Sequence, residues 1–228
     1  MHVGLIGGIG PAATCVYYEA IVGSFATTGL KLELTIAHAD LREMIANMEA
    51  GRAEQQAEIF ARHIEQLRAA GCQAAAVTSM GGHFCINELK AISPLPIIDA
   101  VPALDAFFSA HQASCVGVLG TRKVMETKLY GVATVEVIAP DSDQIDDVHD
   151  AYLRIAASGV AGEKISEFFI EAGARLCRAG AELIVLGGTD LSVAFKGRTP
   201  DYPVADTALI HAAAISQAAM GHRPTRQI

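Results

Sequence analysis

The segment Leu186-Gly187-Gly188-Thr189-Asp190-Leu191 ends a short apolar run that is preceded by Ala179-Gly180. An earlier part of the chain has the same design, because Ala70-Gly71 precedes the apolar run Ala74–Val77, which ends in the polar, glycine-rich segment Thr78–His83. A short apolar run that ends in small polar residues indicates a buried strand followed by a loop. The chain therefore predicts the same strand-and-loop unit twice.

The repeat extends towards the start of the chain. Val116-Gly117-Val118-Leu119-Gly120 has the pattern of Val3-Gly4-Leu5-Ile6-Gly7, and both segments predict a strand that ends at a glycine. Further strands are expected over 32–37 and 96–98, with helices over 11–24 and 54–70. Strands that alternate with helices form parallel sheets through right-handed crossovers. We therefore expect an α/β fold of two similar doubly wound parallel-sheet domains related by pseudo-two-fold symmetry.

The length of the chain is compatible with this division. At about 150 residues per domain, 228 residues make one large domain or two small ones. We expect residues 1–98 with 206–228 to form the first domain and residues 99–205 the second, with the functional site in the cleft between them.

Composition excludes several classes of protein. Hydrophobic residues make up 51% of the chain and charged residues 18%, which excludes a disordered protein. The net charge of −8 argues against nucleic-acid binding, which needs a basic surface. The chain has no long apolar run and opens without a basic signal segment, so no membrane contact and a cytoplasmic location are expected. The five cysteines are odd in number and lack metal-ligand spacing, so no metal site is expected.

The expected topology places a site at the ends of the repeated strands. Ligands of open α/β sheets bind beyond the carboxyl ends of the strands. Thr78–His83 and Gly187–Leu191 follow equivalent strands, so Ser79 and Gly188 are expected to face each other across the cleft. A ligand approached from two sides suits chemistry that inverts a carbon centre.

Several of these loop residues have a structural interpretation beside the functional one. The loop Gly7–Pro11 could hold an anion on its backbone amides or be a plain tight turn. For His83, a hydrogen-bonded structural role is the better interpretation, and a catalytic base is the other. Thr189 or Asp190 could cap the next helix and still contact a ligand. Arg42 is either a solvated surface charge or the partner of a substrate carboxylate.

Several segments resemble the aspartate/glutamate racemase family, within the Asp/Glu/hydantoin racemase superfamily. The opening Gly4–Thr14 resembles the start of the family, the loop ending in His83 resembles Cys-Asn-Thr-x-His, and Leu186–Leu191 resembles Leu-Gly-Cys-Thr-Glu-Leu. Segments 137–141 and 206–211 also match, so the resemblance covers most of the chain.

The resemblance implies two similar α/β domains with the site between them, usually in a homodimer. It also implies racemisation of a small acidic amino acid without a cofactor, in which a thiolate removes the α-proton and a thiol on the opposite face returns one. Ser79 and Gly188 stand at the positions of these two cysteines, and Met80 stands at the neighbouring asparagine.

The loss of both thiols changes the possible chemistry. A free thiol has a pKa of about 8.5, and that of an alcohol is closer to the value for water, about 15.7. This gap of ~7 units is roughly 10 kcal/mol in the cost of forming the base. Ser79 could not replace a thiolate without an activator, and Gly188 transfers no proton. The two-thiol mechanism is excluded unless Cys85 or another cysteine has moved into the site.

Three functions remain open. The first is an enzyme with altered catalytic residues and isomerase-type chemistry at the α-carbon of a small acidic amino acid or related carboxylate. The second is an inactive carboxylate-binding protein, and the third is a structural or regulatory partner without a small ligand. The glycine-rich loops favour the first two. For the enzyme we expect catalysis by Ser79, His83 and Asp190, and substrate binding by Ile9, Gly10, Arg42, Thr78, Met80, Gly81, Thr121, Gly188 and Thr189.

Overall fold

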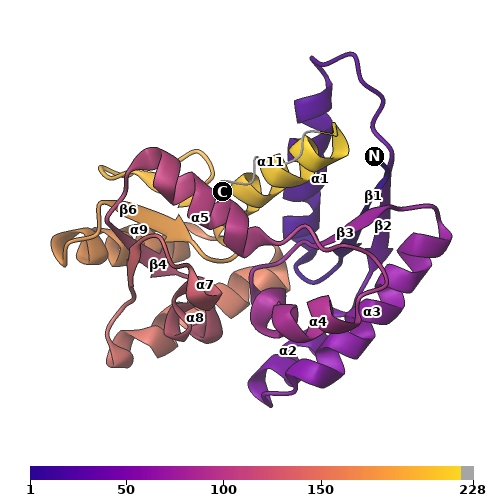
Figure 1. Cartoon of the computed structure of the whole chain (residues 1–228). Helices are drawn as coiled ribbons and strands as arrows, with labels where there is room; N and C mark the ends of the chain where they lie inside the picture. The colour runs from indigo at the N-terminus through magenta and orange to yellow at the C-terminus, as the bar shows by residue number, and fades with distance from the viewer. Residues whose placement is uncertain (222–228) are drawn as a thin grey trace.

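The computed structural model describes residues 1–221, so residues 222–228 at the end of the expected first domain lie outside the described part of the chain. Two sheets form, and every strand pair in them is parallel. The first has the order β2 (Leu34–His38), β1 (Val3–Gly7), β3 (Ala74–Val77). The second has the order β5 (Glu136–Ile138), β4 (Cys115–Leu119), β6 (Leu183–Leu186), β7 (Val204–Asp206). Figure 1 shows the two sheets in separate halves of the molecule.

Helices connect the strands as the alternation predicts. In the first half these are α1 (Pro11–Phe25), α2 (Leu41–Glu49), α3 (Ala53–Ala69), the 3-10 helix η1 (Gly81–Cys85), α4 (Ile86–Ile92) and α5 (Ala100–His111). In the second half they are α6 (Arg122–Glu126), α7 (Lys128–Gly131), α8 (Ser142–Ser158), α9 (Glu163–Arg178), α10 (Leu191–Phe195) and α11 (Thr207–Ala219). Among residues 1–221, none of these helices is both long enough and apolar enough to cross a lipid bilayer.

The prediction of a strand over 96–98 is wrong. This segment makes an isolated parallel bridge between Ile97 and Ala75, with hydrogen bonds from the Ala75 N–H to the Pro96 carbonyl (2.9 Å) and from the Ile98 N–H to the Ala75 carbonyl (2.8 Å). The pairing does not continue beyond this one bridge, whereas β7 pairs with β6 over three residues after Pro203 in the equivalent position. The segment nevertheless lies beside β3 as β7 lies beside β6, so the two halves share one topology.

Side-chain packing follows the same repeat. A Cβ added to Gly4 at the centre of the first sheet would lie 2.7 Å from Cδ1 of Leu67 on α3. A Cβ added to Gly117 in the second sheet would lie 2.9 Å from Cβ of Leu176 on α9. Each glycine therefore allows the helix that leads into β3 or β6 to pack closely on the central strand of its sheet. The expected fold of two similar parallel α/β units is confirmed.

The last helix of each half packs across to the other half. Helix α11 lies beside α1 (Figure 1), and Tyr17 and Ile215 of these helices share one apolar cluster with Leu5 of the first sheet. In turn Leu104 and Phe108 of α5 belong to the apolar core of the second half. This exchange supports the expected division at residues 98–99 and 205–206, which stays a prediction, as do the homodimer and the cytoplasmic location.

Candidate active site between the two halves

A small cavity lies where loops that follow β1, β3, β4 and β6 meet helices α2 and α8. It measures about 10 Å³, which is room for about one water molecule. A substrate would therefore have to separate the helices that close the cavity. Its lining consists of Ile9, Leu41, Met44, Ile45, Met48, Ser79, Gly81, Thr121, Tyr152, Leu153, Ala156 and Asp190.

The structure brings part of the expected site together at this cavity. Ile9, Ser79, Gly81, Thr121 and Asp190 line it, although they come from four separate loops. Ser79, Thr121 and Asp190 are almost fully buried. Parallel strands place their carboxyl ends at one edge of a sheet, which explains why residues so distant in the sequence converge. Their roles in binding and catalysis stay predictions.

Asp190 forms a buried pair with Tyr152, a residue of α8 that the sequence did not single out. The Tyr152 hydroxyl donates a hydrogen bond of 2.8 Å to Oδ2 of Asp190. Burial raises the pKa of the Asp190 carboxyl, and the hydrogen bond from Tyr152 opposes this rise. Burial, followed by the nearby Asp190 charge, raises the pKa of Tyr152 well above its usual 10. Within residues 1–221, Oδ1 of Asp190 has no hydrogen-bond partner. The pair is therefore a neutral phenol bound to a carboxyl group with a free oxygen.

Tyr152 also fills the space beside Gly188. A Cβ added to Gly188 would lie 2.3 Å from Cε2 of the Tyr152 ring and 2.9 Å from its hydroxyl oxygen. Real Cβ atoms do not approach other atoms so closely, so position 188 has no room for a side chain while Tyr152 keeps this place. Gly10 lies close to the same pair, because a Cβ there would lie 3.3 Å from Oδ2 of Asp190. Its φ of +110° is also a backbone conformation that favours glycine.

Ser79 lines the cavity from the first half and has no such partner. In the described residues its hydroxyl oxygen accepts one long hydrogen bond, 3.4 Å from the Gly82 N–H. No histidine, lysine or carboxylate in that part of the chain contacts the hydroxyl through a hydrogen bond. A serine without an adjacent base keeps its proton at neutral pH. The Ser79 hydroxyl can therefore donate to a ligand oxygen but cannot act as a strong base.

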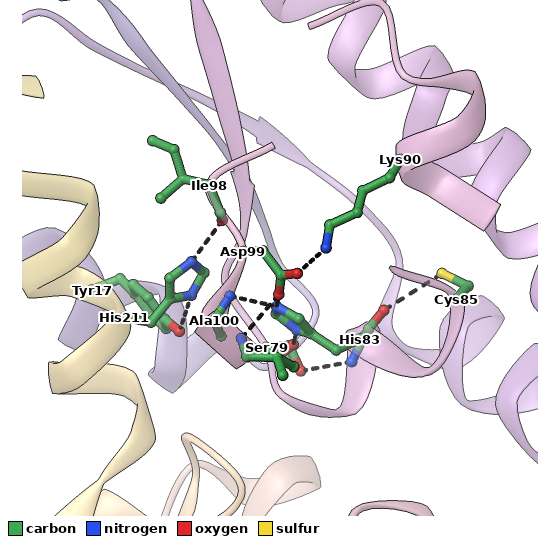
Figure 2. A network of polar contacts seen from close by, with 11 residues as sticks. Tyr17, Ser79, His83, Cys85, Lys90, Ile98, Asp99, Ala100 and His211 are labelled. Atoms are coloured by element: carbon green, nitrogen blue, oxygen red, sulfur yellow. Dashed lines mark hydrogen bonds and ion pairs between the residues drawn. The ribbon is translucent and has the colours of Figure 1, made fainter. Parts of the chain in front are cut away.

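His83 lies behind the Ser79 loop, not in the lining of the cavity (Figure 2). Its Nδ1 donates 2.7 Å to the carbonyl of Ser79, and its Nε2 accepts a 3.3 Å hydrogen bond from the Ala100 N–H. These partners assign the neutral ring. Burial lowers the pKa of His83, despite the opposing charge of Asp99. Both ring nitrogens are therefore engaged, and this geometry favours the structural interpretation of His83.

Two other expected contributors lie away from the cavity. The Arg42 side chain is 93% exposed and lies 3.6 Å from a carboxylate oxygen of Asp40. Cys85 is fully buried in η1, where its thiol contacts the Gly82 carbonyl at 3.5 Å. Burial, with a smaller contribution from Glu88, raises the pKa of the Cys85 thiol to about 12. Neither residue is therefore placed to handle a ligand in this cavity.

The remaining expected residues support the loops from behind. The Thr78 hydroxyl donates 2.8 Å to the Ile6 carbonyl, which ties the end of β3 to β1. Met80 is fully buried in the apolar core of the second half. Thr189 is also fully buried, and its hydroxyl has no hydrogen-bond partner among residues 1–221. Of these three residues, only Thr189, which follows Gly188 directly, has a buried hydroxyl without a hydrogen-bond partner among residues 1–221.

Sequence reasoning missed the residues that helices contribute. Leu41, Met44, Ile45 and Met48 follow the i, i+3, i+4, i+7 spacing of one helical face, and this pattern could have located an apolar wall. Tyr152 carried no such signal. Its relation to Gly188 depends on how α8 packs against the loop after β6, which a single sequence does not reveal.

Comparison with known proteins agrees with this architecture. The sequence model of the Asp/Glu/hydantoin racemase family matches residues 6–215. The chain belongs to this family. Racemase-family structures also share its fold. A candidate Asp/Glu racemase from Yersinia pestis is 24% identical with a TM-score of 0.80, and the match covers 96% of this chain and 100% of the other.

Two further solved structures have a similar fold. An aspartate racemase homologue from Pyrococcus horikoshii is 22% identical with a TM-score of 0.78, over 96% of this chain and 99% of the other. Glutamate racemase from Francisella tularensis, solved with D-glutamate, is 14% identical with a TM-score of 0.65, over 99% of this chain and 84% of the other. At these identities the likeness is one of fold.

Proposed function

We propose that this racemase-family protein catalyses proton transfer at the α-carbon of a small carboxylate without a cofactor, and that Asp190 and Tyr152 form its acid–base pair. We further propose that Ser79 and Gly188 occupy the two cysteine positions of the family. The observation that carries the proposal is the buried Tyr152–Asp190 hydrogen bond beside Gly188, with Oδ1 of Asp190 left without a partner among residues 1–221.

The proposed step needs no group beyond the substrate and these side chains. Oδ1 of Asp190 accepts the α-proton, and the C–H electron pair moves into the substrate carboxylate as an enediolate. The proton on Asp190 exchanges with solvent, and the Asp190 carboxyl group then returns a proton to carbon. Hydroxyl donors from Ser79 and Thr121 stabilise the charge on the enediolate oxygens. Tyr152 holds Asp190 in place and donates to Oδ2 throughout.

A single base has a stereochemical consequence. Because Ser79 has no base to activate it, the opposite face of the carbon lacks a strong proton acceptor or donor. The proton is therefore returned mainly to the face from which it was removed. We expect α-hydrogen exchange with solvent to be faster than inversion of the carbon, and racemisation to be slow.

A second candidate function is binding without catalysis. Burial raises the pKa of both Asp190 and Tyr152, so the pair has a weaker tendency to ionise than exposed groups. A protein that only holds a carboxylic acid would show ligand-dependent stabilisation and no exchange.

Proton exchange in deuterium oxide separates these functions. The protein is incubated with single enantiomers of amino acids and with dicarboxylates, and loss of the α-hydrogen signal is followed by NMR. Exchange that disappears in Asp190→Asn, while the variant still binds the ligand, supports the enzyme. Thermal stabilisation by a carboxylic acid without exchange supports the binding protein. The absence of both effects with every acid would contradict both functions.

A further inference from the structure

The wall of the cavity opposite the polar loops is apolar. It is formed by one face of α2 and one face of α8, through the side chains of Leu41, Met44, Ile45, Met48, Leu153 and Ala156. Leu41, Ile45 and Leu153 are only partly buried and lie at the margins of the apolar cores of the two halves. Four polar side chains, those of Ser79, Thr121, Tyr152 and Asp190, line the same cavity. Three of them follow strands and the Tyr152 hydroxyl bonds to Asp190, so we call this loop side the polar end and the side of α2 and α8 the apolar end.

The described lining offers nothing to neutralise a charged substrate side chain. No lysine, arginine or histidine of residues 1–221 lines the cavity, and its one ionisable acid is Asp190. A carboxylate moved from water to such surroundings loses its hydration without gaining a partner. An acidic side chain is therefore disfavoured at the apolar end, whereas an aliphatic one would contact α2 and α8.

Two cations of the described residues, Arg122 and Lys123, line the adjoining pocket together with Met48 and His149. Burial and the nearby Arg122 charge lower the pKa of His149, so its ring is neutral. Met48 lines both spaces and stands between them. Arg122 is already paired with Asp146, and two carboxylates, Glu49 and Glu126, line the same pocket. A substrate carboxylate that reached past Met48 would therefore meet Lys123 and the already paired Arg122, together with two carboxylates that oppose its binding.

We propose that the substrate carries an uncharged aliphatic side chain, held between α2 and α8, with its reacting carboxylate at the polar end. This inference rests on the proposed function, because it uses the same cavity. It departs from the acidic amino acid that the family resemblance implies, and the departure follows from the lining of this cavity.

A matched pair of ligands tests the proposal directly. Leucine and aspartate have nearly the same shape, because two methyl groups of leucine replace the two carboxylate oxygens of aspartate. Calorimetric titration of the wild-type protein with both enantiomers of each should give a Kd at least tenfold lower for leucine. Equal affinity, or tighter binding of aspartate, would overturn the proposal.

The same samples distinguish this proposal from the proposed function. Leucine binding without α-hydrogen exchange contradicts the catalytic function and leaves the apolar preference standing. Exchange of aspartate but not of leucine contradicts the apolar preference and leaves the catalytic function standing. If neither amino acid binds or exchanges, both are contradicted.

Charge variants on α2 give a second, independent test. Ile45→Lys places a cation at the apolar end and should shift the ratio of the two affinities at least tenfold towards aspartate. Ala46→Lys is the matched control, because Ala46 is exposed on the same helix, and its ratio should equal that of the wild type. Lys123→Gln in the adjoining pocket should also leave the ratio unchanged. A loss of aspartate binding in Lys123→Gln without an effect of Ile45→Lys would overturn the proposal.

Discussion

The loops after β3 and β6 occupy equivalent places in the two halves but present different chemistry to the cavity. The first loop supplies a hydroxyl, that of Ser79, without a base beside it. The second has a glycine at the equivalent position, and a buried pair of Tyr152 and Asp190 stands beside it, because Tyr152 of α8 fills the space and donates a hydrogen bond to Asp190. Each half brings a helix to the cavity, but α2 contributes apolar side chains and α8 also contributes the Tyr152 hydroxyl, so two halves with one topology can present different chemistry.

The largest expected effect breaks this asymmetry by removing the carboxylate. Asp190→Asn keeps the size of the side chain but cannot accept a proton, so α-hydrogen exchange should fall about 100-fold or more, within the usual range for a lost general base. The rate is measured by NMR in deuterium oxide, and circular dichroism controls for the fold. Retention of more than a tenth of the exchange rate would contradict the role of Asp190.

Introducing a thiol on the second loop tests how Tyr152 and Gly188 share space. Gly188→Cys forces a side chain against the Tyr152 ring, and such overpacking costs about 1–3 kcal/mol in the free energy of unfolding. Tyr152→Ala alone should cost about 3–5 kcal/mol, as for other large aromatic side chains. The double variant should lose clearly less than the sum, since each change makes room for the other. Urea denaturation measures these values, and strict additivity would contradict the steric relation.

A smaller effect is expected when the hydrogen bond alone is removed. Tyr152→Phe keeps the ring but removes the donor that lowers the pKa of Asp190, so that pKa should rise further. Exchange needs the carboxylate form and increases as the pH rises through this pKa. The rising limb of the pH–rate profile should therefore move to higher pH. At neutral pH the exchange rate should fall about tenfold, which corresponds to about 1.4 kcal/mol in the activation free energy. A limb that stays in place would show that Tyr152 does not act on Asp190.

The smallest effect is expected in the first loop. Ser79→Ala removes one hydroxyl donor and no base, so exchange should fall only about threefold, by less than in Tyr152→Phe, and the pH–rate profile should keep its shape. The measurement is the same exchange assay over a range of pH. A loss as large as that of Asp190→Asn would indicate that the two halves contribute bases equally.

Much of the fold could be predicted from this sequence, because glycine-punctuated apolar runs recur in the same order in both halves. The error at residues 96–98 arose from apolar residues beside prolines, where the ladder is too short to form a strand. In the site, Ser79 and Asp190 could be predicted because they follow buried strands directly. Tyr152 could not be predicted, since its position depends on how a helix packs against a distant loop. Arg42 also lies just after a strand, and for that reason we expected it to contact a ligand. Its side chain faces solvent instead.

The central claim is that acid–base function resides on one face of the site, at Asp190 and Tyr152. The most direct measurement starts from each single enantiomer of leucine and of aspartate in deuterium oxide, and compares the rate of α-hydrogen exchange with the rate of inversion. The account predicts exchange that is faster than inversion for a bound enantiomer and that is lost in Asp190→Asn. Equal rates of exchange and inversion, or exchange that persists in Asp190→Asn, would contradict it.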